Sequence, residues 1–131
     1  MATWEDLTRC VTDVQFRPKV LCRNAAMKAR YRTHRANMSA SFPSHGDYIK
    51  ATYMATGEAT VCVANLFPYN VDPSIKHYVM WSIRPLTPDE AAAELARHLP
   101  GQATLHFVNE RKYQSVPELW HCQVFAHDLN Q

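Results

Sequence analysis

The sequence predicts an α+β fold, a single domain over residues 1–131 in which an antiparallel sheet of about four strands packs with N-terminal helices and one inserted helix. Three observations predict this fold. Capped, helix-forming segments fill a basic first part, about residues 1–56, whereas alternating β-branched runs fill about residues 57–131. One strongly capped helix interrupts these runs. The order helices, strand, strand, helix, strand, strand is typical of helices packed on an antiparallel sheet.

The first part contains two predicted helices, at residues 3–13 and 24–40. Residues 16–22 are interpreted as an extended segment, and the stretch 42–57 is left undecided. Thr3 and Asn24 are suited to cap the two helices, because their side-chain oxygens can accept a hydrogen bond from a free backbone N–H. The undecided stretch turns at Pro43–Gly46. It then continues as a short helix or a strand that ends at Gly57.

The second part alternates four strands with one helix. Alternating and β-branched residues predict the strands, which cover residues 59–65, 75–83, 103–109 and 119–127. The helix "LTPDEAAAELARHL" has Thr87 as its cap, Pro88 at its first position and Glu90 to complete a capping box. The stretch "ERKYQSVP" between the last two strands is long enough for a hairpin loop.

Composition argues against several classes of protein. No apolar run reaches the ~20 residues of a membrane helix, and the first residues are acidic where a signal peptide would be basic. The four cysteines form no C-x-x-C pair, so a disulfide scaffold and a zinc ribbon are both disfavoured. We therefore expect reduced thiols, no membrane contact and a location in the cytoplasm or the nucleus.

Basic charge is concentrated in residues 9–35, where eight lysines and arginines accompany Asp13 alone and give a net charge of +7. Residues 36–131 carry a net charge of −3. Together with Phe16 and Tyr31, these cations are suited to contact phosphates and stacked bases, so nucleic acid is one candidate partner. The alternative is a solvated helix face with a few arginines bonded to the body, because no nucleic-acid-binding motif is present.

The last strand, "LWHCQVFAH", carries the strongest candidate site. His121 and Gln123 are two residues apart, so their side chains share one face of the strand at roughly 7 Å between Cα atoms. A core face rarely holds two successive polar side chains, since each needs a buried partner. The pair therefore favours a site, and two satisfied core residues are the alternative. Cys122 points to the other face and is interpreted as a small buried apolar residue.

Two further residues are candidates on their own chemistry. His77 lies in the middle of its strand and is either a core histidine bonded to a carbonyl or a general acid/base. Arg23 lies near the start of the basic helix and can meet an anion there. No pair of histidines or acids has a recognised metal spacing, so we assign no metal ligand, and no cofactor is identified.

Three stretches of the sequence resemble the N-acetylglucosamine-induced protein 1-like family, a fungal group of uncharacterised domains with relatives in large DNA viruses: "FRPKVLCRNAAMKARY", "ANLFPYNVDPSIKHYVMW" and "FVNERKYQSVPELWHCQVF". The family pattern is an Asn–x–x–Pro–Tyr turn, an Ile–x–His strand ending in Trp, a later Asn, Ser–Val and a His–x–His–Val strand. The matching positions are Asn65, Pro68, Tyr69, Ile75, His77, Trp81, Asn109, Ser115, Val116, His121 and Val124. Gln123 replaces the second histidine. The resemblance implies no reaction and leaves a viral origin open.

The end of the chain is also similar to the histidine-triad superfamily of nucleotide hydrolases and transferases. In its transferase branch a His–x–His–x–Gln strand supplies a histidine that attacks phosphorus and a glutamine that holds a phosphate oxygen. This resemblance makes His121 the nucleophile and Gln123 the holder, with Leu119 in place of the first histidine. Asn109 and Ser115 would then bond the developing phosphate charge.

Three functions follow as hypotheses. The first is a small enzyme acting on a phosphorylated sugar or nucleotide through a polar His/Asn cleft, with His121 and His77 as catalytic residues. The ligand-binding residues would be Gln123, Asn65, Tyr69, Asn109, Ser115 and Arg23. The second is a non-enzymatic binding module for a ligand, a partner protein or nucleic acid, and the third is a metal-dependent hydrolase. Each is compatible with a homo-oligomer.

Overall fold

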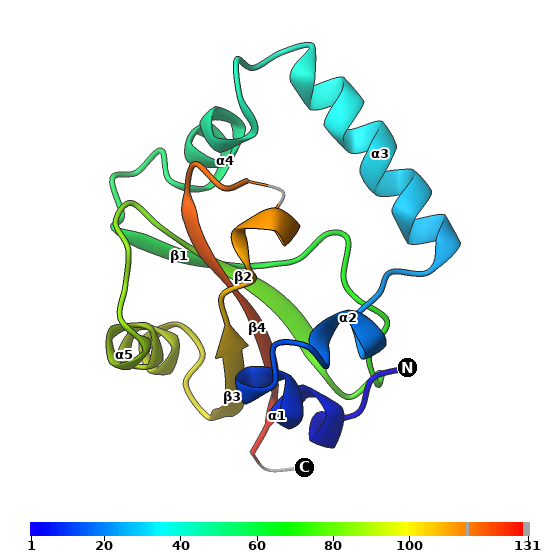
Figure 1. The fold of residues 1–131 in the computed structure, drawn as a ribbon. Helices are drawn as coiled ribbons and strands as arrows, with labels where there is room; N and C mark the ends of the chain where they lie inside the picture. Colours follow the sequence, from blue (N-terminus) through cyan, green and yellow to red (C-terminus); the bar gives the residue numbers. More distant parts are fainter. Residues whose placement is uncertain (115, 130–131) are drawn as a thin grey trace.

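The computed structural model describes residues 1–114 and 116–129, with the side chain of Tyr113 excepted. Four helices precede the first strand, and one helix separates the second strand from the third (Figure 1). The elements are α1 (Trp4–Thr12), α2 (Arg17–Val20), α3 (Ala25–Ser39), α4 (His45–Tyr53), β1 (Thr60–Ala64), β2 (Lys76–Ser82), α5 (Pro88–His98), β3 (Gln102–Phe107), a 3₁₀ turn at Arg111–Tyr113 and β4 (Trp120–Asp128). Within this described part, no helix is both long and apolar enough to span a membrane.

The four strands form one antiparallel sheet in the order β1-β2-β4-β3, which confirms the predicted α+β fold. β4 lies inside the sheet and pairs with β2 on one side and β3 on the other. In this register Gln123 lies opposite Val79 of β2 and Phe107 of β3, and His121 lies opposite Trp81. Because residues directly opposite one another share a face, these five side chains lie on the same side of the sheet.

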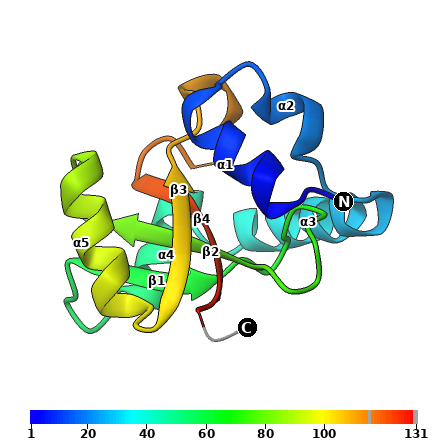
Figure 2. The ribbon, with the colours of Figure 1, turned by 90° about the horizontal axis from the view of Figure 1, so that it is seen from below.

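α5 covers one face of the sheet, and the N-terminal helices lie on the other side (Figure 2). Met80, Cys122 and Val124 point toward α5 and are fully buried with its Leu95. The prediction that Cys122 faces away from His121 is therefore confirmed. Burial raises the pKa of the Cys122 thiol to about 12, so this residue is a neutral part of the core.

The opposite face is covered in two separate places. α1 packs its Leu7 and Cys10 over one end of the sheet, against Phe107 and Phe125. α4 packs over the other end, where its Ile49 meets a cluster of strand and loop residues that includes Val61, Val79, Trp81, Val116 and Leu119. Between these two apolar clusters the same face presents His121 and Gln123.

The segment 16–22, predicted as extended, contains the short helix α2, so that prediction was wrong. Pro18 is compatible with the first turn of a helix, because its missing N–H is not needed there. The tertiary contacts of Arg17 hold the turn: its guanidinium donates to the carbonyls of Cys10 and Val11 at the end of α1, and to that of Val108. The contact with Val108 joins residues 91 positions apart and leaves no local pattern.

The undecided stretch 42–57 contains a helix, α4, which begins at His45 within the predicted turn and ends at Tyr53 rather than Gly57; Ser44 caps it by accepting a hydrogen bond from the Asp47 N–H. The presence of a glycine at position 46, in the first turn of α4, is explained by a close neighbour. The Gly46 N–H donates to Glu118 Oε1 at 2.8 Å, and a Cβ at this position would lie 2.8 Å from Glu118 Cγ. A larger residue at this position would displace the Glu118 side chain, so the glycine that makes the sequence look unlike a helix fits the neighbouring loop.

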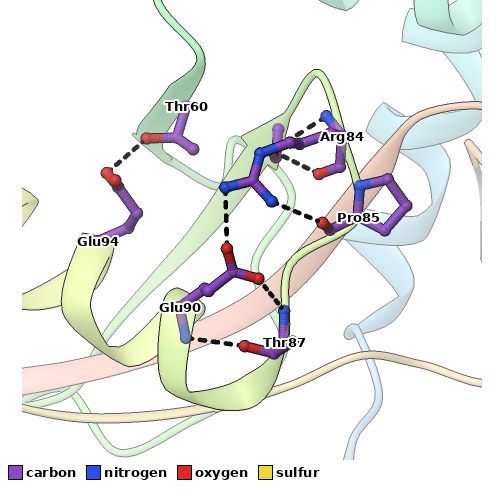
Figure 3. A network of polar contacts seen from close by, with 7 residues as sticks. Thr60, Arg84, Pro85, Thr87, Glu90 and Glu94 are labelled. Atoms are coloured by element: carbon purple, nitrogen blue, oxygen red, sulfur yellow. Dashed lines mark hydrogen bonds and ion pairs between the residues drawn. The ribbon is translucent and has the colours of Figure 1, made fainter.

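α5 begins with the predicted capping box (Figure 3). Thr87 Oγ1 accepts from the Glu90 N–H, and the Glu90 carboxylate accepts from the Thr87 N–H and from Arg84. The bond from Arg84, followed by the bonds from Thr87, holds the pKa of Glu90 at about 2. The helix is further tied to β1, since Thr60 donates to the Glu94 carboxylate.

We expect Thr87→Ala to lower the free energy of unfolding by about 1 kcal/mol, because the Glu90 N–H loses its acceptor at the helix end. Urea denaturation followed by circular dichroism measures the change. Thr87→Ser keeps the hydroxyl and is the matched control. Equal losses in both variants would show that the methyl group, rather than the cap, is the stabilising feature.

Candidate functional site

A cavity of about 110 Å³ opens between the sheet and the helices α3 and α4, in the gap between the two apolar clusters. Six of the eight residues assigned to the site from the sequence line it: Arg23, Asn65, Tyr69, Asn109, His121 and Gln123. They come from the loop before α3, the loop after β1, the loop after β3 and β4. The fold thus brings together residues up to 100 positions apart in the chain. Ser115, also assigned to the site, lies outside the described residues.

His77 does not line this cavity and lies behind Gln123. Its ring is buried and packs nearly parallel to the rings of Tyr69 and Phe125, with ring centroids at 4.9 and 4.6 Å. Nδ1 accepts a hydrogen bond from the Tyr69 N–H at 3.1 Å, so the ring proton is on Nε2 and is donated to Gln123 Oε1 at 2.6 Å. Burial lowers the pKa of His77 to about 4, and the imidazole is neutral at pH 7.

These bonds determine how two amides face the cavity. Since the Gln123 carbonyl oxygen accepts from His77, the Gln123 NH₂ group is its remaining polar end. The Asn65 amide is oriented in the same way: its Oδ1 accepts a hydrogen bond from the Phe67 N–H at 2.8 Å, so its NH₂ group is the remaining polar end. The 3.5 Å contact between Asn65 Nδ2 and His77 Nε2 joins two N–H groups in this arrangement and is not a hydrogen bond. Both amides therefore offer donors.

Arg23 brings a positive charge to the same cavity. Its Nε donates to the Phe67 carbonyl, and the guanidinium lies over the rings of Tyr31 and Tyr69, at 4.7 and 5.3 Å from their centroids. The backbone bond leaves the terminal NH₂ groups of the guanidinium for other acceptors. No aspartate or glutamate is among the described residues that line the cavity, so its only fixed charge there is positive.

His121 contributes a lone pair. Its Nδ1 lies 2.9 Å from the Leu119 carbonyl, which can only accept, so Nδ1 carries the proton and Nε2 is unprotonated. The ring packs against Trp81, with centroids 4.6 Å apart. Burial lowers the pKa of His121, an effect that the Leu119 carbonyl and Glu118 partly oppose. At pH 7 the side chain is a neutral base in the same cavity as the donors of Gln123, Asn65 and Arg23.

Sequence reasoning missed the wall that α3 and α4 provide. His34, His45 and Tyr48 line the cavity opposite the sheet, and the His34 ring lies 5.3 Å from Tyr48 and 6.3 Å from His45. Burial, and then the charge of Arg35, lower the pKa of His45 to about 4. The available signal was His34, a histidine that interrupts the apolar stripe formed by Met27, Tyr31 and Met38 in the sequence of this helix. Among the residues that the structure describes, no three His, Cys, Asp or Glu side chains are arranged to hold a metal ion.

Two comparisons with known proteins give matches. Residues 3–102 match a family model described as "Protein of unknown function (DUF3605)". A solved structure described as "Crystal Structure of HTC1" has a TM-score of 0.68 and 23% identity, over 97% of this chain and 85% of that chain. At this identity the likeness shows a shared fold alone. None of the curated proteins matches the chain significantly. The descriptions of these matches mention neither the N-acetylglucosamine-induced protein 1-like family nor the histidine-triad superfamily. Both resemblances therefore stay predictions.

We expect acid to destabilise the protein partly through His77. Its pKa is about 4 in the folded state and 6.5 for a free histidine, so between these values the unfolded chain binds more protons. The free energy of unfolding should fall as the pH decreases through this window. In His77→Gln the fall should be shallower, as measured by urea denaturation at several pH values. An identical slope in both proteins would contradict a neutral, buried His77.

Proposed function

Since the chain belongs to the DUF3605 family, which has no assigned function, we propose from the cavity itself that the protein binds the phosphate group of a phosphorylated sugar or nucleotide and transfers it through His121. The observation that carries this proposal is the polarity of the cavity: the amide oxygens of Gln123 and Asn65 are used by the protein, and their NH₂ groups are left for a ligand.

A phosphate group matches this set of contacts. Its oxygens only accept hydrogen bonds when ionised, and the cavity offers the Gln123 and Asn65 amides and the Arg23 guanidinium as donors. A ligand with donors of its own, such as an ammonium group, would meet a positive charge and few free acceptors. The absence of a carboxylate from the described lining residues favours an anion for the same reason.

The size of the cavity limits which part of the ligand it encloses. Its volume of about 110 Å³ is well below the roughly 300–1,000 Å³ of pockets that surround a drug-sized ligand. A phosphate group fits such a volume, whereas a sugar or a nucleoside would extend toward the opening. Tyr48 among the lining residues offers an aromatic ring to this second part.

The neutral His121 is suited to attack phosphorus. The Nε2 lone pair forms an N–P bond as the bond from phosphorus to the leaving oxygen breaks, and the leaving group takes that electron pair and a proton from water. The imidazole becomes cationic, and the Leu119 carbonyl, which accepts from Nδ1–H, stabilises the charge. Water then attacks phosphorus, the N–P bond breaks, and phosphate and neutral His121 are released.

Binding is tested by thermal shift with inorganic phosphate, a hexose phosphate and a nucleoside monophosphate, each beside its unphosphorylated counterpart. The phosphorylated compounds should raise Tm, in line with about 2.7 kcal/mol of stabilisation at 100 times the Kd. Gln123→Glu replaces a donor with an anion and should weaken binding about tenfold or more. Arg30→Ala removes an exposed charge outside the cavity and serves as the control. Equal shifts with the unphosphorylated compounds would contradict the proposal.

Turnover is tested with the ligands that bind. Release of inorganic phosphate should be lost in His121→Ala while the ligand still raises Tm, because binding rests on the other cavity residues. His106→Ala removes a histidine on β3 that pairs with Val124, on the α5 side of the sheet, and should keep full turnover. Intact-mass measurement after rapid quenching in base should detect one phosphoryl group on the wild-type protein. Binding without turnover would make the cavity a binding module.

A further inference from the structure

The segment that forms α2 and α3 carries positive charges and no negative charge. From Val14 to Gly46 the chain holds seven lysines and arginines and no aspartate or glutamate: Arg17, Lys19, Arg23, Lys28, Arg30, Arg32 and Arg35. The Arg17 guanidinium donates hydrogen bonds to three backbone carbonyls of the protein itself. None of the four cations on α3 takes part in a salt bridge with another described residue. Unneutralised cations on one element repel one another and favour an anionic partner.

Three of these cations form a row on one side of α3. Lys28, Arg32 and Arg35 recur at spacings of four and three residues, so they lie on the same side of the helix along about 10 Å of its axis. Lys28 and Arg32 are exposed and Arg35 is half-buried. Arg30 is also exposed but points about 160° away from Arg32, because two residues advance a helix by about 200°.

The row reaches the cavity through Tyr31. The Arg35 guanidinium lies 5.9 Å from the centroid of the Tyr31 ring, and Arg23 lies 4.7 Å from the same centroid. Tyr31 and Arg23 both line the cavity. Four cations thus follow one another from the cavity wall along an exposed side of α3, which runs along the edge of the molecule opposite α5 (Figure 1).

We infer that the ligand is the phosphorylated end of a single-stranded nucleic acid, with the terminal phosphate in the cavity and the following phosphates along Lys28, Arg32 and Arg35. The inference rests on the proposed function, because the cavity must accept a phosphate. An end suits the cavity, because a terminal phosphate has one sugar to place at the opening, whereas an internal phosphodiester would have to place both of its neighbouring sugars there. A strand with regularly spaced phosphates makes use of a row of cations, whereas a sugar phosphate uses Arg23 alone.

The experiment is fluorescence anisotropy with a single strand of about ten nucleotides, carrying a dye at its 3′ end and either a phosphate or a hydroxyl at its 5′ end. The phosphorylated strand should bind at least about tenfold more tightly than the hydroxyl strand. It should also bind at least about tenfold more tightly than a nucleoside monophosphate used as competitor. The affinity should fall steeply between about 50 and 200 mM salt.

Two matched variants separate the row from overall charge. Arg32→Glu should weaken strand binding at least about tenfold and leave binding of the monophosphate unchanged, whereas Arg30→Glu, with the same change of net charge, should leave both nearly unchanged. Equal losses in the two variants would overturn the inference. So would equal affinity for the two 5′ ends, or binding of inorganic polyphosphate where the strand does not bind. Monophosphate binding with no gain for the strand would overturn the inference and keep the proposed function.

Discussion

The chemical character of the cavity depends on one chain of hydrogen bonds, from the Tyr69 N–H through His77 to Gln123. The backbone N–H at one end can only donate, so each group further along has its role determined: Nδ1 of His77 accepts, Nε2 donates, and Gln123 presents its NH₂ group. Burial against Tyr69 and Phe125 keeps His77 neutral, which preserves this arrangement at physiological pH. In the proposed function His77 is therefore a positioning residue for Gln123.

This polar arrangement is possible because the sheet is stabilised on either side of it. The face that carries His121 and Gln123 is covered by α1 at one end and by α4 at the other, and both helices supply fully buried apolar contacts. The other face is sealed by α5. With burial of apolar surface supplied elsewhere, the middle of the face can hold polar side chains that are only partly satisfied within the protein. Such a gap between packed helices is where ligand sites commonly lie.

Local patterns were sufficient for most of the fold. Alternation predicted the four strands, and capping residues predicted α1, α3 and α5 to within one or two residues. The failures involve distant segments. α2 is held partly by Arg17, which donates to the carbonyl of Val108, 91 residues later in the chain, and Gly46 in α4 lies against Glu118, 72 residues later. Neither contact leaves a trace in the neighbouring sequence, so periodicity and propensity cannot detect it.

For the site, the sequence by itself determined which side chains share a strand face: the period of two places His121 and Gln123 together and Cys122 away from them. It also marked the concentration of basic charge in residues 9–35. Only the tertiary structure decided that Arg23, Asn65 and Asn109 meet this pair, that His34 and His45 form the facing wall, and that His77 stands behind Gln123. The reason is physical: alternation is a local property of one strand, whereas the strand order β1-β2-β4-β3 and the position of α3 arise from packing between segments far apart in the chain.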